Sequence, residues 1–197
     1  GGNNTAIGYE ALTANTTASD NTAVGMRSMR LTTTGIENTA LGTSSLQHNT
    51  SGDSNTAIGR LALQQNTTAN NNTAVGRAVL QQTTTGQSNS ALGVNALGST
   101  TTGRDNTAVG LDALAYSTTG EDNTGLGYQA GDNITTGSNN TVIGNAADAS
   151  SATVSNEITL GNSNISALRC QVALTVLSDE RDKTDIVDLP VGLDFIN

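Results

Sequence analysis

Apolar and polar positions repeat along this chain every seventeen residues, in the same order each time. The first repeat begins with Asn4-Thr5-Ala6-Ile7-Gly8, and equivalent stretches recur at constant spacing until Glu157-Ile158-Thr159-Leu160-Gly161. Positions are numbered from Asn4 as columns one to seventeen; column four is always aliphatic and column five is always glycine. Self-similarity at a constant period indicates equivalent units stacked along one axis. The ten copies therefore predict a solenoid of ten coils.

The first four columns predict one short β-strand in each coil. Asn-Thr-Ala-Ile and its variants contain β-branched residues and end at glycine, which suits a strand of about four residues and not a helix. The glycine predicts a corner with positive φ or close backbone approach. Columns eight and nine, usually Ala-Leu, predict a second short strand, and the Thr-Thr-Gly of columns thirteen to fifteen predicts a polar turn. Stacked coils pair their strands in parallel at about 4.8 Å, so the predicted length is on the order of 50 Å.

The composition predicts that the core is shared between chains. Aromatic residues make up 2% of the chain and tryptophan is absent, so no large globular core is available. Two aliphatic residues per coil are few to offset the entropy of ordering the whole coil. The small residues of column three, such as Ala23 and Ala40, would let neighbouring backbones approach closely. We therefore expect three chains around one core.

The charge distribution narrows the range of partners. A net charge of −9 argues against nucleic acid or an anionic membrane as the main partner. Six of the seventeen acidic residues lie in the last twenty residues, which indicates a different C-terminal module. No apolar run approaches the roughly 18 residues that a membrane span needs, so no membrane insertion is expected. Gly1 enters within a repeat, and we expect the natural chain to begin earlier.

The unit Asn-Thr-Ala-Ile/Val-Gly-x-x-Ala-Leu resembles the head repeats of trimeric autotransporter adhesins and similar repeats in phage tail fibres. The resemblance covers residues 1 to about 165. It implies an all-β fold, a homotrimeric parallel β-roll or β-helix solenoid, which is left-handed in that family. The period of seventeen is longer than is usual for those heads, and we place the extra length in the Thr-Thr-Gly turn. Residues 1–168 are assigned to this shaft and residues 169–177, an alternating apolar stretch, to a short neck strand.

The segment after the neck contains Lys183, the only lysine of the chain, five residues after Ser178. Leu177-Ser178, the charged residues that follow and the closing stretch 192–197 resemble the start of the endosialidase-type intramolecular chaperone. That module caps trimeric phage fibres and spikes, aids their assembly and then cleaves itself off. The resemblance implies Ser178 as the nucleophile, Lys183 as its base and cleavage at the Leu177–Ser178 bond. Residues 178–197 are assigned to this domain, which we expect to be partly helical and truncated at Asn197.

The same residues also have a purely structural interpretation. Ser178 followed by Asp179 and Glu180 is a good helix N-cap with acids in the first turn, and Lys183 would then be a solvated charge among carboxylates. A lysine activates a serine only if burial lowers the lysine pKa. An offset of five residues also places the two side chains about 140° apart on an ideal helix. The pair can therefore meet only through a helix break or between subunits.

Other residues with metal-binding or thiol chemistry give weaker signals. His48 occupies a turn column without a second His or a Cys beside it, and the single cysteine, Cys170, is expected to be a buried thiol. Column seventeen, which contains Asp20, Asn71 and Asp105, offers oxygen ligands for Ca²⁺ between coils, but stacked Asn hydrogen bonds explain it as well. We expect no metal site and no cofactor.

Together these patterns predict a virion structural protein, the shaft of a homotrimeric phage tail fibre or spike. Its expected partners are other tail-fibre or baseplate proteins and a host cell-surface glycan or protein receptor. A bacterial trimeric autotransporter-type adhesin at the cell surface is the alternative, and it should lack the Ser178/Lys183 module. Ice binding or other surface binding by the repeats is a third, although column six mixes Tyr9, Met26 and Arg60 and so offers no regular surface. No turnover enzyme is expected, because the repeats contain no recurring carboxylate pair of the kind that glycan cleavage needs. The only reaction expected is a single self-cleavage.

Overall fold

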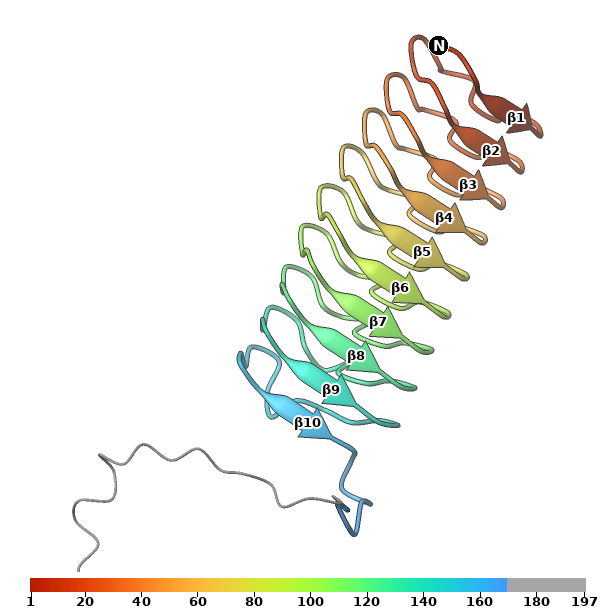
Figure 1. The fold of residues 1–197 in the computed structure, drawn as a ribbon. Helices are drawn as coiled ribbons and strands as arrows, with labels where there is room; N and C mark the ends of the chain where they lie inside the picture. Colours follow the sequence, from red (N-terminus) through yellow and green to blue (C-terminus); the bar gives the residue numbers. More distant parts are fainter. Residues whose placement is uncertain (170–197) are drawn as a thin grey trace, which may run out of the picture. The chain divides into compact units, whose positions relative to one another are not determined.

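The computed structural model of the chain describes residues 1–169. Its first compact unit, Gly1–Ile165, is a solenoid in which every coil contributes one strand to a single ten-stranded sheet (Figure 1). The strands are β1 (Thr5–Ile7), β2 (Thr22–Val24), β3 (Thr39–Leu41), β4 (Thr56–Ile58), β5 (Thr73–Val75), β6 (Ser90–Leu92), β7 (Thr107–Val109), β8 (Thr124–Leu126), β9 (Thr141–Ile143) and β10 (Ile158–Leu160). Residues 166–169 belong to a second unit and have no regular secondary structure. Within residues 1–169, no helix has the length and apolar character of a membrane span.

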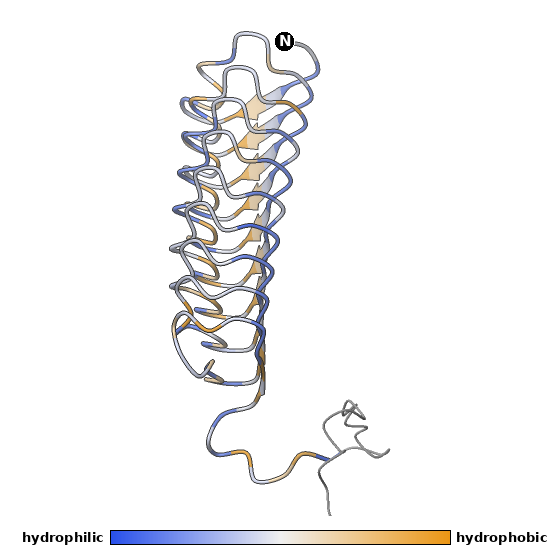
Figure 2. Ribbon diagram, turned by 90° about the vertical axis from the view of Figure 1, so that its left-hand side faces the viewer, coloured by the Kyte–Doolittle hydropathy of each residue, from blue (hydrophilic) through white to orange (hydrophobic). Residues whose placement is uncertain are grey.

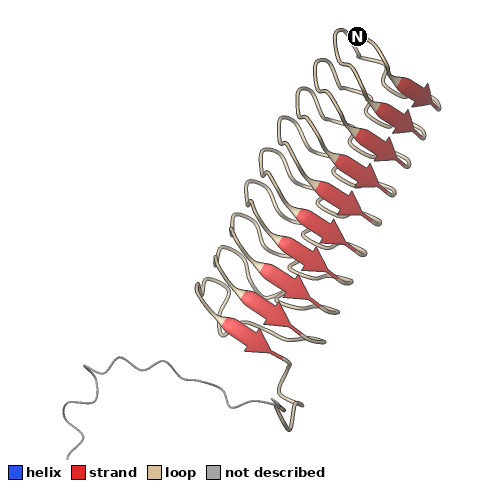
Figure 3. Ribbon diagram, in the orientation of Figure 1, coloured by secondary structure: helices blue, strands red, loops and turns tan. Residues whose placement is uncertain are grey.

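All strands of the sheet run parallel and in chain order, each one paired with the strand of the next coil. The register is constant, with Thr5 opposite Thr22 and Ile58 opposite Val75. The remaining sides of each coil are loops and turns (Figure 3). The parallel solenoid predicted from the period is therefore confirmed. Each strand has three residues, one fewer than predicted, because column one does not join the ladder of backbone hydrogen bonds. The backbone N of Asn55, for example, donates to the side-chain Oδ1 of Asn38 in the preceding coil and not to a backbone oxygen.

The second strand predicted at columns eight and nine does not form. Residues in columns seven and nine have positive φ, for example 57° at Ser44 and 50° at Leu46, which a β-strand does not allow. The backbone amides of columns seven and nine point in opposite axial directions. Ser44 N donates to Met26 O of the preceding coil at 2.9 Å, and Leu46 N donates to Ala62 O of the following coil at 2.9 Å. Neighbouring coils are thus hydrogen-bonded on this side without forming a sheet.

The column-five glycines make the corner that ends each strand. From Gly8 to Gly144 their φ lies between 126° and 141°, and Gly161 has a φ of 82°. A Cβ added at Gly8 would lie 2.6 Å from the carbonyl oxygen of Gly25 in the next coil. Both predicted reasons for this glycine, positive φ and close backbone approach, are confirmed.

The solenoid closes a core within one chain. The middle residue of most strands is a buried alanine, such as Ala40 or Ala57, and it packs in one cluster with the column-nine leucines, including the fully buried Leu46, Leu63 and Leu80. Column three is therefore small because Leu fills the coil interior, and the predicted role of Ala23 and Ala40 in contacts between chains is wrong. The prediction that one chain has too few apolar groups to cover itself is wrong for the coil interior.

Two glycines near the C-terminal end show how tightly this core is filled. A Cβ added at Gly125, in column three, would lie 2.7 Å from Cγ of Leu114. At Gly131, which replaces the column-nine leucine, a Cβ would lie 2.9 Å from Cδ2 of Leu114 and in contact with Cγ2 of Val142, in column three of the next coil. Column nine thus loses its large residue where column three gains one. This exchange keeps the interior filled, as close packing requires.

A ladder of buried asparagines forms one corner of the solenoid. Asn55 is typical: its backbone N and its Nδ2 donate to Oδ1 of Asn38, at 2.9 and 3.1 Å, and its Nδ2 also donates to the carbonyl oxygen of Ala69 at 2.8 Å. Oδ1 of Asn55 in turn accepts from the backbone N of Asn72 at 3.0 Å. One amide side chain thereby binds three successive coils. The side chain is fully buried, so this pairing removes polar groups that would otherwise be costly to desolvate.

Candidate interaction surface

The outward side of the parallel sheet forms a regular surface, which we call the strand face. It consists of the first and third residues of every strand, because side chains alternate along a strand and the middle residue points inward. Column two presents threonine, serine at Ser90 and isoleucine at Ile158, and column four presents Ile, Val or Leu. Figure 2 shows the hydrophobic colouring on the stacked strands. The chain thus displays two parallel columns, one mainly of hydroxyls and one of aliphatic groups.

The aliphatic column is more exposed than apolar side chains usually are in a folded chain. Ile7 exposes 61% of its surface, while Leu41, Leu92, Leu126 and Leu160 expose between 46% and 50%. The valines of this column are half-buried. At roughly 10 Å across and nine strand spacings long, the strand face covers about 400 Å². The aliphatic column is one of the two columns in this area, and an exposed apolar patch beside polar groups often marks an interaction site.

The middle of the strand face carries a shallow depression over β5, β6 and β7. Leu92 lies between the smaller Val75 and Val109, and Ser90 lies in the neighbouring column between two threonines. The lining is almost entirely apolar. No titratable group lines this depression, so it is suited to packing and not to acid–base chemistry.

A second threonine column, column thirteen, has a structural role. The hydroxyl of Thr33 donates to the carbonyl oxygen of Thr50 at 3.0 Å, and that of Thr50 donates to the carbonyl oxygen of Thr67 at 2.9 Å. The same bond recurs from coil to coil. These hydroxyls hold the Thr-Thr-Gly turns together, so the regular threonine columns whose hydroxyls remain free are those of the strand face and of column fourteen.

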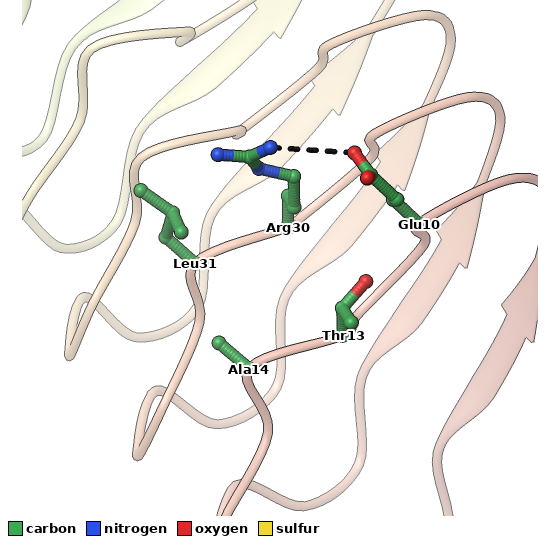
Figure 4. A pocket seen from close by; sticks show the side chains of 5 residues that line it. All are labelled: Glu10, Thr13, Ala14, Arg30 and Leu31. Atoms are coloured by element: carbon green, nitrogen blue, oxygen red, sulfur yellow. Dashed lines mark hydrogen bonds and ion pairs between the residues drawn. The ribbon is translucent and has the colours of Figure 1, made fainter.

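A small hollow on the side opposite the strand face lies between the first two coils (Figure 4). Glu10 accepts hydrogen bonds from Nε of Arg27 at 3.0 Å and from Nη1 of Arg30 at 3.3 Å. Partial desolvation of Glu10 opposes its ionisation, but the bonds from Arg30 and Arg27 outweigh it and lower the Glu10 pKa. The hollow is lined by this satisfied ion pair with Thr13, Ala14 and Leu31, and it contains no unpaired acid or base for catalysis.

The last coils contain one carboxyl group with a raised pKa. Burial raises the pKa of Asp132, and the neighbouring Asp148 adds repulsion and a hydrogen bond in the same direction. Glu157 takes the place of the column-one Asn in the last coil. Hydrogen bonds from Ser150 and Thr159 lower the Glu157 pKa. Residues 1–169 hold no group of three or more His, Cys, Asp or Glu able to bind a metal ion.

The residues predicted from the sequence to carry chemistry fall into two groups. Leu177, Ser178 and Lys183 lie outside the described residues, as do Cys170 and most of the predicted neck. His48 is half-buried, with Nδ1 2.6 Å from Oε1 of Gln65, so it belongs to a side-chain ladder between coils. The column-seventeen residues are exposed and have positive φ, for example 59° at Asp20. Asp and Asn tolerate positive φ better than most residues, so their presence in this column needs no bound cation as its explanation.

Comparison of the chain with protein-family models, with curated proteins and with solved structures finds no match. The strand face therefore has to be interpreted from its own geometry. The sequence pattern contained a signal for it, since Thr-Ala-Ile alternates large, small and large residues. This alternation places columns two and four on one side of the strand, but it does not decide which side faces the interior.

Proposed function

We propose that this chain is the shaft of a homotrimeric phage tail fibre or spike, and that three copies associate through their strand faces. The exposed aliphatic column carries this proposal, because the coil interior is already filled and the column remains open along all ten strands. Burial of each half-exposed Leu or Ile would contribute roughly 1 kcal/mol, so a stripe of this length favours association strongly. The resemblance of the repeats to trimeric heads supports three chains.

The regular order of the strand face also favours copies of the same chain as the partner. Each coil presents the same pair of columns, so parallel copies in register bring equivalent coils together at every level. A heterologous partner would need groups that repeat at the same axial spacing of about 4.8 Å to match the face over its length. The shaft would then extend the reach of a particle toward its host, with attachment to a host-surface receptor and to other tail-fibre or baseplate proteins as its function.

Leu92→Asp is expected to convert a trimer into monomers. The parent should have a mass of about 60 kDa in solution, three times the chain mass of 19.9 kDa. In the variant, three carboxylates would meet in an apolar contact, and burying unpaired charges is far more costly than the lost contact. Light scattering after size-exclusion chromatography measures the mass directly.

The matched control is Leu111→Asp. Leu111 has a similar exposure, 42% against 49% for Leu92, but it lies in column six, beyond the glycine corner. The Leu111→Asp variant should therefore remain trimeric. A parent that is monomeric at all concentrations, or equal behaviour of the two variants, would contradict association through the strand face.

We further propose that the C-terminal segment aids trimer assembly and cuts itself at Leu177–Ser178, with Ser178 as nucleophile and Lys183 as base. The full-length protein should yield a fragment that ends at Leu177. The Ser178→Ala variant should stay intact, because no hydroxyl remains to attack the bond. Mass spectrometry of the intact chains under denaturing conditions measures cleavage in the parent and in the variant. Cleavage of the variant at the same bond would disprove this role.

Binding to an ordered surface such as ice is a second candidate, and the strand face specifically favours it. The column-six irregularity does not exclude it, since the regular array lies in columns two and four. Hydroxyl and aliphatic groups recur there at about 4.8 Å along the axis. Thermal hysteresis in a solution of the parent would support this function. A trimer that buries the face and shows no hysteresis would exclude it.

A further inference from the structure

The charges of the solenoid are segregated along its axis. Residues 54–104, about three coils, contain no Asp or Glu, although the whole chain has a net charge of −9. The same stretch contains three arginines, Arg60, Arg77 and Arg104. Carboxylates reappear at Asp105 and continue to Glu157. A cationic belt thus lies between two acidic parts of the shaft.

Two of these arginines have no acidic partner. Arg104 donates to Glu121 at 3.1 Å, and hydrogen bonding and attraction from that carboxylate raise the Arg104 pKa. Within residues 1–169 the ion pairs involve Arg27, Arg30 and Arg104, and neither Arg60 nor Arg77 takes part in one. Both are exposed. Their guanidinium groups are therefore free to bind an external anion.

The fold holds Arg60 and Arg77 directly above one another. Both occupy column six, one coil apart, so their backbones lie at about the 4.8 Å spacing of parallel strands. The carbonyl oxygen of Arg60 accepts from the backbone N of Ala78 at 2.9 Å, and that of Arg77 accepts from the backbone N of Asn95 at 3.0 Å. These bonds fix both residues between neighbouring coils. Column six directly follows the column-five glycine, where the chain turns away from the sheet, so the two arginines lie outside the strand face.

The packing of the chain gives no reason for this arrangement. Like charges directly opposite one another destabilise a folded chain, and column six accepts Thr43 and Val94 in the coils on either side. Two stacked arginines offer ten N–H donors in planar forks that match carboxylate or sulfate oxygens. The arrangement is costly without a ligand and is well suited to one.

We propose that Arg60 and Arg77 form a binding site for a linear anionic polysaccharide carrying carboxylate or sulfate groups. Such a polymer presents its charges in a row, as the two arginines do along the axis. The inference deepens the proposed host attachment and rests on it, since a trimer would present three equivalent arginine pairs, one on each side of the shaft, to the polymer chains of one host surface.

The test measures binding of the full chain to immobilised polygalacturonate, dextran sulfate and neutral dextran. The Arg60→Gln/Arg77→Gln variant should bind the anionic polymers at least about tenfold more weakly than the parent, because charge-assisted hydrogen bonds are lost. Binding by the parent should weaken with added salt and be absent on dextran. Preference between the two anionic polymers assigns carboxylate or sulfate. The control Arg27→Gln/Arg104→Gln removes the same charge from arginines that already have acidic partners, and it should bind like the parent.

Several outcomes would overturn this inference. They are absence of binding to both anionic polymers, equal loss in the two double variants, and equal binding of single-stranded DNA, which would indicate a general polyanion surface. The unfolding temperature of Arg60→Gln/Arg77→Gln should be equal to or above that of the parent, which separates lost binding from lost folding. A trimer that fails to bind overturns only this site. A monomer that binds through the two arginines overturns the trimeric shaft and leaves this site standing.

Discussion

Gly76→Ala is expected to abolish folding of the solenoid around its fifth coil. Gly76 has a φ of 133°, a region that only glycine occupies readily, and strain there costs about 1–3 kcal/mol for other residues. The added Cβ would also overlap the carbonyl oxygen of Gly93 in the next coil, a backbone atom that cannot move without breaking the coil spacing. We expect a loss of at least about 4 kcal/mol in unfolding free energy, since strain and steric overlap add.

Urea unfolding at one fixed chain concentration measures this effect, because association makes the midpoint concentration-dependent. Gly2→Ala is the matched control. A Cβ at Gly2 has no heavy atom within 4 Å and its φ is not positive, so its midpoint should stay within error of the parent. A loss below about 1 kcal/mol for Gly76→Ala would show that the corner is looser than its geometry indicates.

Asn72→Leu is expected to destabilise the solenoid by about 4 kcal/mol although it replaces a polar residue by an apolar one of similar size. Oδ1 of Asn72 accepts from the backbone N of Asn89 at 2.9 Å, and its Nδ2 donates to the carbonyl oxygen of Gly86 at 2.9 Å. Leucine leaves both of these groups buried and unpaired. Each unpaired buried group costs about 1–3 kcal/mol, which exceeds the gain from burying an extra apolar side chain.

The control for the ladder is Thr85→Ala, an exposed threonine in column fourteen of the same coil. It should change the unfolding free energy by no more than about 0.5 kcal/mol. Both variants are compared with the parent by thermal and urea unfolding at equal concentration. If Asn72→Leu matched the parent, the ladder would be a consequence of the coil geometry and not a source of its stability.

Much of the architecture follows from the period of the sequence. A constant spacing without insertion requires equivalent residues to stack, so the parallel register of Thr5 with Thr22 needs no tertiary information. The glycine in column five likewise predicts its corner, because no other residue occurs there. The position of the strand follows from the β-branched residues that precede this glycine.

The conformation of columns seven to nine could not be predicted in this way. Ala-Leu has no local preference for positive φ, and Leu63 adopts a φ of 49° because its amide pairs with Val79 O of the next coil at 3.0 Å. A contact between coils therefore overrides the local preference of the residue. The same applies to Asn55, whose amide is buried only because three coils meet at its corner.

The sequence alone determined the number of coils, their register and the residues that share each face, since these depend only on periodicity. It also indicated that columns two and four lie on one side of the strand. Only the tertiary structure decided that this side faces outward. The reason is volume: where leucine occupies column nine it fills the interior and leaves space in column three only for a small residue, so the larger aliphatic residues of column four remain on the surface.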